Sequence, residues 1–206
     1  MNDFIRRSNY YQNPSILHVG CEAPRAYFIP YDTEEEALRG NRDRSTRFYN
    51  LCGDWDFTFY NSVNDLPADL TVDDPTHRTD KVAVPRSWQT YPGRGYDTPN
   101  YVNIQYPISF DPPFVPDDNP CGLYRRTFRV HPRMLEKSVY INFEGVDSCF
   151  YLYINGQFVG YSQVSHMTSE WDVTKYLVPG DNDIRVLVLK WCDGSYLEDG
   201  TFSATT

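Results

Sequence analysis

Alternation of apolar and polar side chains dominates the chain from about residue 47 onward and predicts β-strands. Segment 55–60, WDFTFY, alternates large apolar side chains with smaller or polar ones. Residues 124–130 form a candidate strand with a basic face, and 139–143 and 183–190 are further candidates, rich in Val, Ile and Leu. Short strands at this spacing, with turn signals between them and few helices, are typical of a β-sandwich.

The clearest single element is a β-hairpin over residues 150–163. Two aromatic-rich runs flank Asn155 and Gly156. An Asn-Gly pair favours the positive φ angles of a type I′ turn, which joins two antiparallel strands. Because a slip of one residue would turn every buried side chain outward, the turn also fixes the register. We therefore expect this hairpin to be central to folding.

Helical signals are few. Residues 1–45 have the pattern of an irregular arm with one short helix, in which Thr33 caps, Glu36 follows three residues later and Gly40 ends the helix. Further along, Ser169 is predicted to cap a short helical turn that Pro179-Gly180 closes.

A Pro-rich segment over residues 107–120 separates two of the predicted strands. It cannot be a central strand, because prolines would remove donors from the hydrogen-bond ladder. Its length is typical of a functional or interfacial loop.

Composition narrows the classes of partner and of compartment. The net charge of -9 disfavours nucleic acid and anionic membrane surfaces as partners. The first fifteen residues have no apolar core of a signal peptide, so we expect a cytoplasmic protein. The five Cys have irregular spacings without a CxxC motif, which favours reduced thiols over a disulfide framework. The four His lack an HxH or HExxH motif, and we expect no metal site from them.

Two sets of side chains are candidates for chemistry. Flat aromatic rings with a polar handle can bind sugars, but packing of the β-sandwich is the favoured role for the cluster Trp88, Tyr91, Tyr96 and Tyr101. Glycoside hydrolysis needs two carboxylates roughly 5 to 10 Å apart. Neither Glu198 with Asp199 nor Glu144 with Asp147 has a suitable arrangement, and solvated turn carboxylates are the favoured interpretation.

Several segments in a fixed order carry more information than any of these motifs. They are LCGDWDF (51–57), VPRSWQ (84–89), NIQYPISFDPPFVP (103–116), INGQFVGYSQ (154–163) and WCDGSYLED (191–199). Together they resemble the N-terminal region of bacterial family 2 β-galactosidases over about residues 13–199. The resemblance implies an extended arm over residues 1–45, a galactose-binding-like jelly-roll β-sandwich over 46–199, and a non-family tail over 200–206.

The same resemblance assigns roles to few residues. Family members are retaining β-galactosidases whose catalytic Glu pair and Mg²⁺ ligands lie on a following barrel, so we expect no catalytic residue here. An Asn before a Tyr-Pro pair contacts the sugar in the family, and Asn103 matches it as a substrate-binding residue. Thr201 stands where the family has an Asp that contacts the sugar and Na⁺, and a hydroxyl cannot replace that charged ligand. We therefore expect no metal and no cofactor in this chain.

Alternative functions follow from these expectations. The first is a truncated, frameshifted or excised part of a β-galactosidase, inactive alone. The second is a free-standing carbohydrate-binding or protein-interaction module. The third is a component that becomes active with a barrel supplied in trans. The expected partners are the barrel in cis or in trans, galactosides bound weakly, and a second copy of the chain, because a missing strand would leave an open sheet edge.

Overall fold

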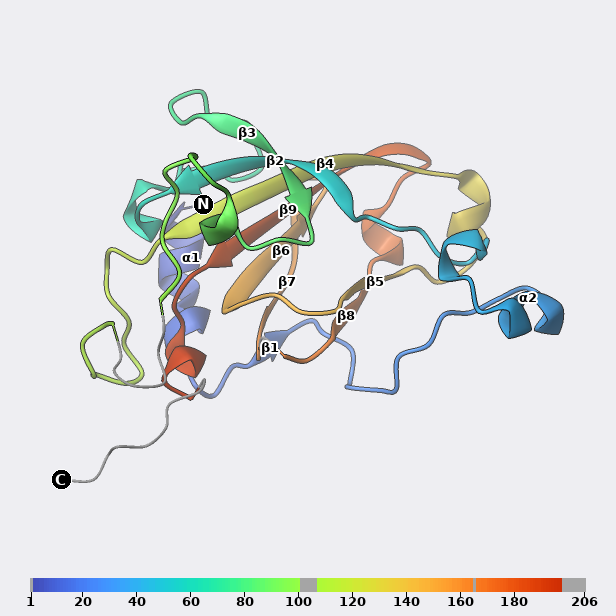
Figure 1. Cartoon of the computed structure of the whole chain (residues 1–206), viewed down its shortest axis with the longest axis horizontal. Helices are drawn as coiled ribbons and strands as arrows, with labels where there is room; N and C mark the ends of the chain where they lie inside the picture. The colour runs from blue at the N-terminus through green and yellow to red at the C-terminus, as the bar shows by residue number, and fades with distance from the viewer. Residues whose placement is uncertain (1, 101–106, 165, 198–206) are drawn as a thin grey trace.

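The computed structural model describes residues 2–100, 107–164 and 166–197 and has two antiparallel sheets of unequal size (Figure 1). The larger sheet has seven strands in the order β1-β7-β6-β9-β4-β2-β3, and the smaller pairs β5 with β8. The all-β sandwich predicted from the sequence is confirmed. The strands are β1 His18–Val19, β2 Gly53–Tyr60, β3 Thr79–Val84, β4 Cys121–Val130, β5 Tyr140–Phe143, β6 Cys149–Ile154, β7 Gln157–Gln163, β8 Ser169–Asp172 and β9 Gly180–Leu189.

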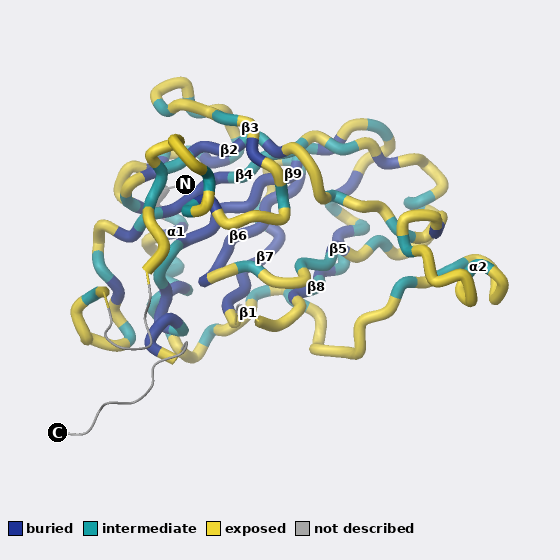
Figure 2. Tube along the Cα trace, viewed as in Figure 1, coloured by how far each residue is buried: buried dark blue, intermediate teal, exposed yellow. Residues whose placement is uncertain are grey.

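Strands β6 and β9 lie at the centre of the larger sheet and are buried on both faces (Figure 2). Successive side chains of a strand point to opposite faces. In β6, Tyr151 and Tyr153 therefore join one core, while Phe150, Leu152 and Ile154 join the other. Burial of every position explains why this strand has a continuous apolar run rather than a polar alternation.

Different elements cover the two faces of the larger sheet. On one face, helix α1 (Asn2–Ser8) and the 3-10 helix Tyr10–Gln12 place Ile5 and Tyr11 in the core. The ring of Tyr10 lies 5.4 Å from that of Tyr161. On the other face, the small β5–β8 sheet supplies Ile141 and Trp171 to the core. The sandwich is therefore closed on one side by the arm and on the other by the small sheet.

The arm contains more regular structure than the one short helix predicted. Helix α2 (Glu34–Arg39) has the expected ends, since Thr33 accepts from the Glu36 N–H at 3.2 Å and Gly40 has a φ of 64°. Helix α1 and strand β1 were not predicted. Short helices are marginal by themselves, and α1 depends on aromatic packing, with the ring of Phe4 4.8 Å from that of Phe158.

The predicted hairpin is confirmed as β6 and β7. Asn155 has a φ of 49° and Gly156 a φ of 76°, as a type I′ turn requires. Within β7, Gly160 permits a close approach, because a Cβ there would lie 2.2 Å from both Trp171 Nε1 and the Val19 carbonyl oxygen. Trp171 Nε1 donates to that carbonyl at 3.0 Å, so it joins the arm to the small sheet.

The prediction for Ser169 is wrong. Ser169 begins β8 and pairs with Phe143, and the helical turn lies later, at Thr174–Tyr176. Ser169 and Trp171 are buried while Glu170 and Asp172 are less so, which is the alternation of a strand. The expected loop over residues 107–120 is confirmed as irregular.

Substitution of Gly156 by Val should destabilise the protein. The nearest atom to an added Cβ is Thr71 Cβ at 3.8 Å, so the cost is backbone strain at positive φ and not a clash. We expect a loss of about 1–2 kcal/mol in the free energy of unfolding, measured by urea denaturation. Gln157→Val, at the exposed next position, is the matched control and should change stability little. Equal midpoints for the two variants would contradict the turn assignment.

Candidate functional site

The end of β9 organises the loops on that side of the sheet. After Leu189 the chain continues beside residues 119–120, where the Lys190 N–H donates to the Pro120 carbonyl at 2.9 Å. The fully buried Asn119 side chain then accepts from the Trp191 N–H at 2.9 Å and donates to the Trp191 carbonyl at 2.8 Å. This paired contact substitutes for a strand ladder and fixes the backbone where the loops converge.

Lys190 holds the segment that precedes residue 101. Its ammonium group forms an ion pair with Asp97 and donates to the Thr98 carbonyl at 3.2 Å and to the Asn100 side chain. The Lys190 side chain is 10% exposed and that of Asp97 16% exposed, so the pair is largely shielded from water. A shielded ion pair is costly to break, because either partner alone would leave a buried charge.

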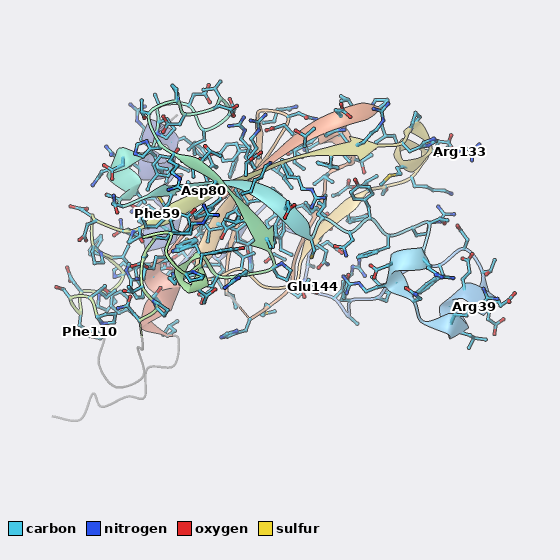
Figure 3. The ribbon with its side chains drawn as sticks, turned by 45° about the horizontal axis from the view of Figure 1, so that its top comes forward. Arg39, Phe59, Asp80, Phe110, Arg133 and Glu144 are labelled. Carbon is cyan, nitrogen blue, oxygen red and sulfur yellow. The ribbon has the colours of Figure 1, made fainter. Side chains whose placement is uncertain are left out.

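Tyr196 holds the segment that follows residue 106. It lies in the 3-10 helix Asp193–Tyr196, and its phenol oxygen is 2.5 Å from the Phe114 carbonyl oxygen and 2.9 Å from that of Ser109. Its ring meets Phe110 edge-on at 5.6 Å. Phe110 lies at the opposite end of the molecule from Arg39 of α2 (Figure 3). Residues 190–196 therefore bind the described segments on both sides of residues 101–106, among which Asn103 lies.

Asp193 is the unusual group in this region. The residue is only 7% exposed, so its carboxylate is largely shielded from water. Burial raises the pKa of Asp193, against the opposing influence of the Gln163 side chain and the Gly194 N–H. Burial in a medium of low polarity favours the neutral carboxyl group over the charged carboxylate. Among the described residues, no group of three His, Cys, Asp or Glu side chains is arranged to hold a metal ion.

The candidates from the sequence fall into three groups. The substrate-binding candidate Asn103 lies outside the described residues, and so do Tyr101, Glu198, Asp199 and Thr201. Glu144 and Asp147 are exposed, and Glu144 pairs with Arg42 at 3.0 Å, as solvated turn carboxylates do. The aromatic cluster packs: the Trp88 ring lies 6.0 Å from that of Phe57, and Tyr91 and Tyr96 donate to the Ala83 carbonyl and the Asp80 carboxylate.

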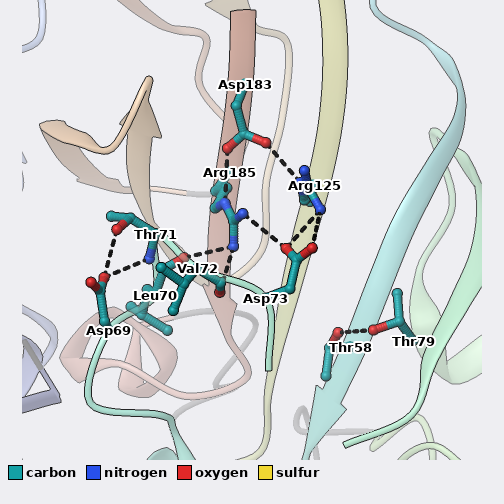
Figure 4. A network of polar contacts seen from close by, with 10 residues as sticks. All are labelled: Thr58, Asp69, Leu70, Thr71, Val72, Asp73, Thr79, Arg125, Asp183 and Arg185. Atoms are coloured by element: carbon teal, nitrogen blue, oxygen red, sulfur yellow. Dashed lines mark hydrogen bonds and ion pairs between the residues drawn. The ribbon is translucent and has the colours of Figure 1, made fainter. Parts of the chain in front are cut away.

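An ionic network on the opposite half of β9 was missed from the sequence (Figure 4). Arg185 is 5% exposed and donates to Asp183 at 2.8 Å, to Asp73 at 3.0 Å and to the carbonyls of Leu70 and Val72. Arg125 on β4 donates to Asp183 at 2.7 Å and to Asp73 at 2.6 Å. A charged residue inside the apolar run IRVLVL was the available signal, but it does not identify the partners.

Two recesses are present on the described surface. One of about 240 Å³ lies between β2, β4 and residues 72–74, next to the ionic network. The other, of about 160 Å³, lies between arm residues 22–25 and β8, where Arg25 forms a paired contact with Glu170 at 2.7 and 2.8 Å. No helix in the described part of the chain is long and apolar enough to cross a membrane.

Comparisons with known proteins agree with this architecture. Residues 48–205 match the family described as "Glycosyl hydrolases family 2, sugar binding domain". The chain is 51% identical over 191 residues to a β-galactosidase of Actinobacillus pleuropneumoniae and 41% identical over 194 residues to one of Staphylococcus xylosus. These alignments cover 93% and 94% of the chain but only 18% and 19% of those relatives.

A solved structure shows a similar fold at low sequence identity. The β-glucuronidase of Faecalibacterium prausnitzii is 18% identical, with a TM-score of 0.51 over 68% of this chain and 20% of that one. That likeness concerns the fold alone, whereas the sequence match covers most of the chain. The chain belongs to glycosyl hydrolase family 2, and residues 48–205 are its sugar-binding domain.

Proposed function

We propose that this chain is the jelly-roll sugar-binding part of a β-galactosidase and acts with a catalytic barrel supplied in cis or in trans. The main support is the identity of 51% to a β-galactosidase of which the chain spans 18%. The anchoring of residues 97–100 by Lys190 and of 109–114 by Tyr196 gives this role a physical basis. A site built on rigid supports loses less entropy when it binds a ligand.

In this proposal the chain binds and orients a galactoside but does not cleave it. Cleavage requires an acid and a nucleophile or base at a defined separation, and the barrel would supply both together with the Mg²⁺ ligands. Asn103 would contact sugar hydroxyls, because an amide can both donate and accept hydrogen bonds. The described part of the chain has five free cysteines, which supports a cytoplasmic location as part of the same proposal.

The isolated chain should release no nitrophenol from a chromogenic β-galactoside. The reason is that the acid and the nucleophile or base of glycoside hydrolysis would both come from the barrel in this proposal. The measurement is continuous absorbance with highly purified protein. Turnover that disappears when a carboxylate of this chain is replaced would contradict the proposal.

Asn103→Ala should lower kcat/KM in an enzyme reassembled from this chain and a barrel-containing partner. Loss of one hydrogen bond of about 1.5 kcal/mol predicts roughly a tenfold decrease. Asn61→Ala, in an exposed loop, is the matched control. An Asn103→Ala enzyme indistinguishable from this control would show that the residue does not contact the sugar.

Lys190→Met should also lower kcat/KM, because Lys190 positions the segment that precedes residue 101. The substitution removes the ion pair with Asp97 and the hydrogen bonds to Thr98 and Asn100. We expect a lower kcat/KM, partial rescue by Lys190→Arg, and no effect of Lys175→Met, whose ammonium lies over the Tyr176 ring. Equal values for Lys190→Met and Lys190→Arg would argue against a positioning role.

Self-association through an open sheet edge is the remaining expectation about partners. Strand β9 pairs with β4 and β6, so the outer strands of the described sheets are β1, β3, β5 and β8. Unpaired edges promote pairing between chains. We predict a mass above the monomer by light scattering that rises across a concentration series. A monomer with a cooperative melt at high concentration would refute it.

A further inference from the structure

The loop over residues 69–76 borders the recess of about 240 Å³ at β2 and β4. Arg185 donates to the carbonyls of Leu70 and Val72, at 3.1 and 2.8 Å, and so holds this loop on the sheet (Figure 4). The Asp69 carboxylate accepts from the Thr71 N–H at 2.8 Å, which closes a local turn. The recess is therefore formed before any ligand arrives, as is usual for small-molecule sites.

Asp74 stabilises the same loop at a second local turn, over residues 74–76. Its carboxylate accepts from the Thr76 N–H and from Tyr60 and His77 side chains, at 2.8, 3.1 and 2.8 Å. Burial alone would raise the pKa of Asp74, but these hydrogen bonds outweigh it and lower the value to about 2. The carboxylate is thus saturated with donors and serves to fix the loop.

Three groups lining the recess keep unused hydrogen-bonding capacity. Arg125 uses Nε and Nη1 for Asp183 and Asp73, and its Nη2 has no partner among the described residues. Asp56 pairs with Lys81 through Oδ1 at 2.7 Å, and within the described part of the chain its Oδ2 has no partner. The hydroxyls of Thr58 and Thr79 lie 2.9 Å apart, and since only one of them donates to the other, one O–H remains available.

The charge balance of the recess selects the class of ligand. Its guanidinium groups already face carboxylates, and Asp56, Asp73 and Asp74 would repel an added anion. The neighbouring Arg125, Arg185 and Lys81 would repel an added cation. A neutral ligand with alternating donors and acceptors matches the free groups, and the hydroxyls of a sugar have that property.

We infer that this recess is a second sugar-binding subsite, which holds a single neutral monosaccharide ring and lies at the opposite half of β9 from Lys190. Arg125 Nη2 and the free threonine hydroxyl donate to ring hydroxyls, and Asp56 Oδ2 accepts from one. Leu123 and Val72 supply apolar surface beside them. The choice of a galactoside as ligand rests on the proposed function, whereas the position of the subsite does not.

Titration of the isotope-labelled chain with methyl β-galactoside tests the inference by NMR. We expect saturable shifts of the Thr58, Thr79 and Val72 amides, with a Kd of about 1 mM, or about 4 kcal/mol of binding free energy. The double variant Thr58→Val with Thr79→Val, which removes both hydroxyls at nearly constant shape, and Arg125→Met should each weaken binding at least tenfold. Thr127→Val and Arg129→Met, on exposed positions of the same strand β4, are matched controls and should bind as the parent does.

The outcomes separate this inference from the proposed function. Because Arg125→Met also breaks ion pairs, its thermal melt is compared with that of the double threonine variant, which keeps the ionic network intact. Shifts confined to residues 96–100 and 190–197, or binding unchanged in the double threonine variant, would overturn the subsite. Asn103→Ala should leave binding at the recess unchanged. A lowered kcat/KM for Asn103→Ala together with no binding at the recess would leave the proposed function standing.

Discussion

Burial of β6 and β9 on both faces is the constraint on which the rest of this structure depends. A strand that is apolar on both sides needs two separate coverings, and here they come from distant parts of the chain. The arm packs Ile5 and Tyr11 on one face, and the small sheet packs Trp171 on the other. Gly160 is the point where both coverings meet, because Trp171 and the Val19 carbonyl approach it so closely.

The same constraint determines where polar side chains can lie. Arg185 occupies a buried position on β9, so its charge must be matched by Asp73 and Asp183. The contacts of Arg185 with Asp73 and with the Leu70 and Val72 carbonyls fix the loop beside the recess. At the other end of the strand, Asn119 and Lys190 bind the loops that lead toward residues 101–106. Both ends of one central strand thus specify the surroundings of a potential ligand site.

Local patterns in the sequence predicted the elements whose cause is local. The Asn155-Gly156 turn and the Thr33 to Gly40 helix depend on the residues within them, and both are confirmed. Helix α1 and the role of Ser169 depend on contacts with remote segments, so their local signals were weak or misleading. The ionic network of Arg125 and Arg185 was not predictable, because pairing of β4 with β9 brings these residues together.

The site itself was only partly accessible to the same reasoning. Asn103 came from a resemblance between sequences and not from its own chemistry, and it lies outside the described residues. A single basic residue after an apolar strand does not predict a function, so the sequence did not identify Lys190. Its contacts with residues 97–100 in the structure indicate its supporting role. The contacts of a supporting residue such as Lys190 depend on tertiary structure and cannot be predicted from local sequence. A ligand-contacting residue such as Asn103 can be identified from a sequence motif.

The position of the arm has a consequence for the order of events during synthesis. Residues of α1 and β1 leave the ribosome before the hairpin that contains their partners, and His18 bonds to Ser162 across 144 positions of sequence. The arm therefore cannot pack until the hairpin has been synthesised, and its apolar side chains stay exposed to solvent until then. Contacts so remote in sequence slow the final closure of the core and lengthen the time during which the nascent chain can be bound by a chaperone.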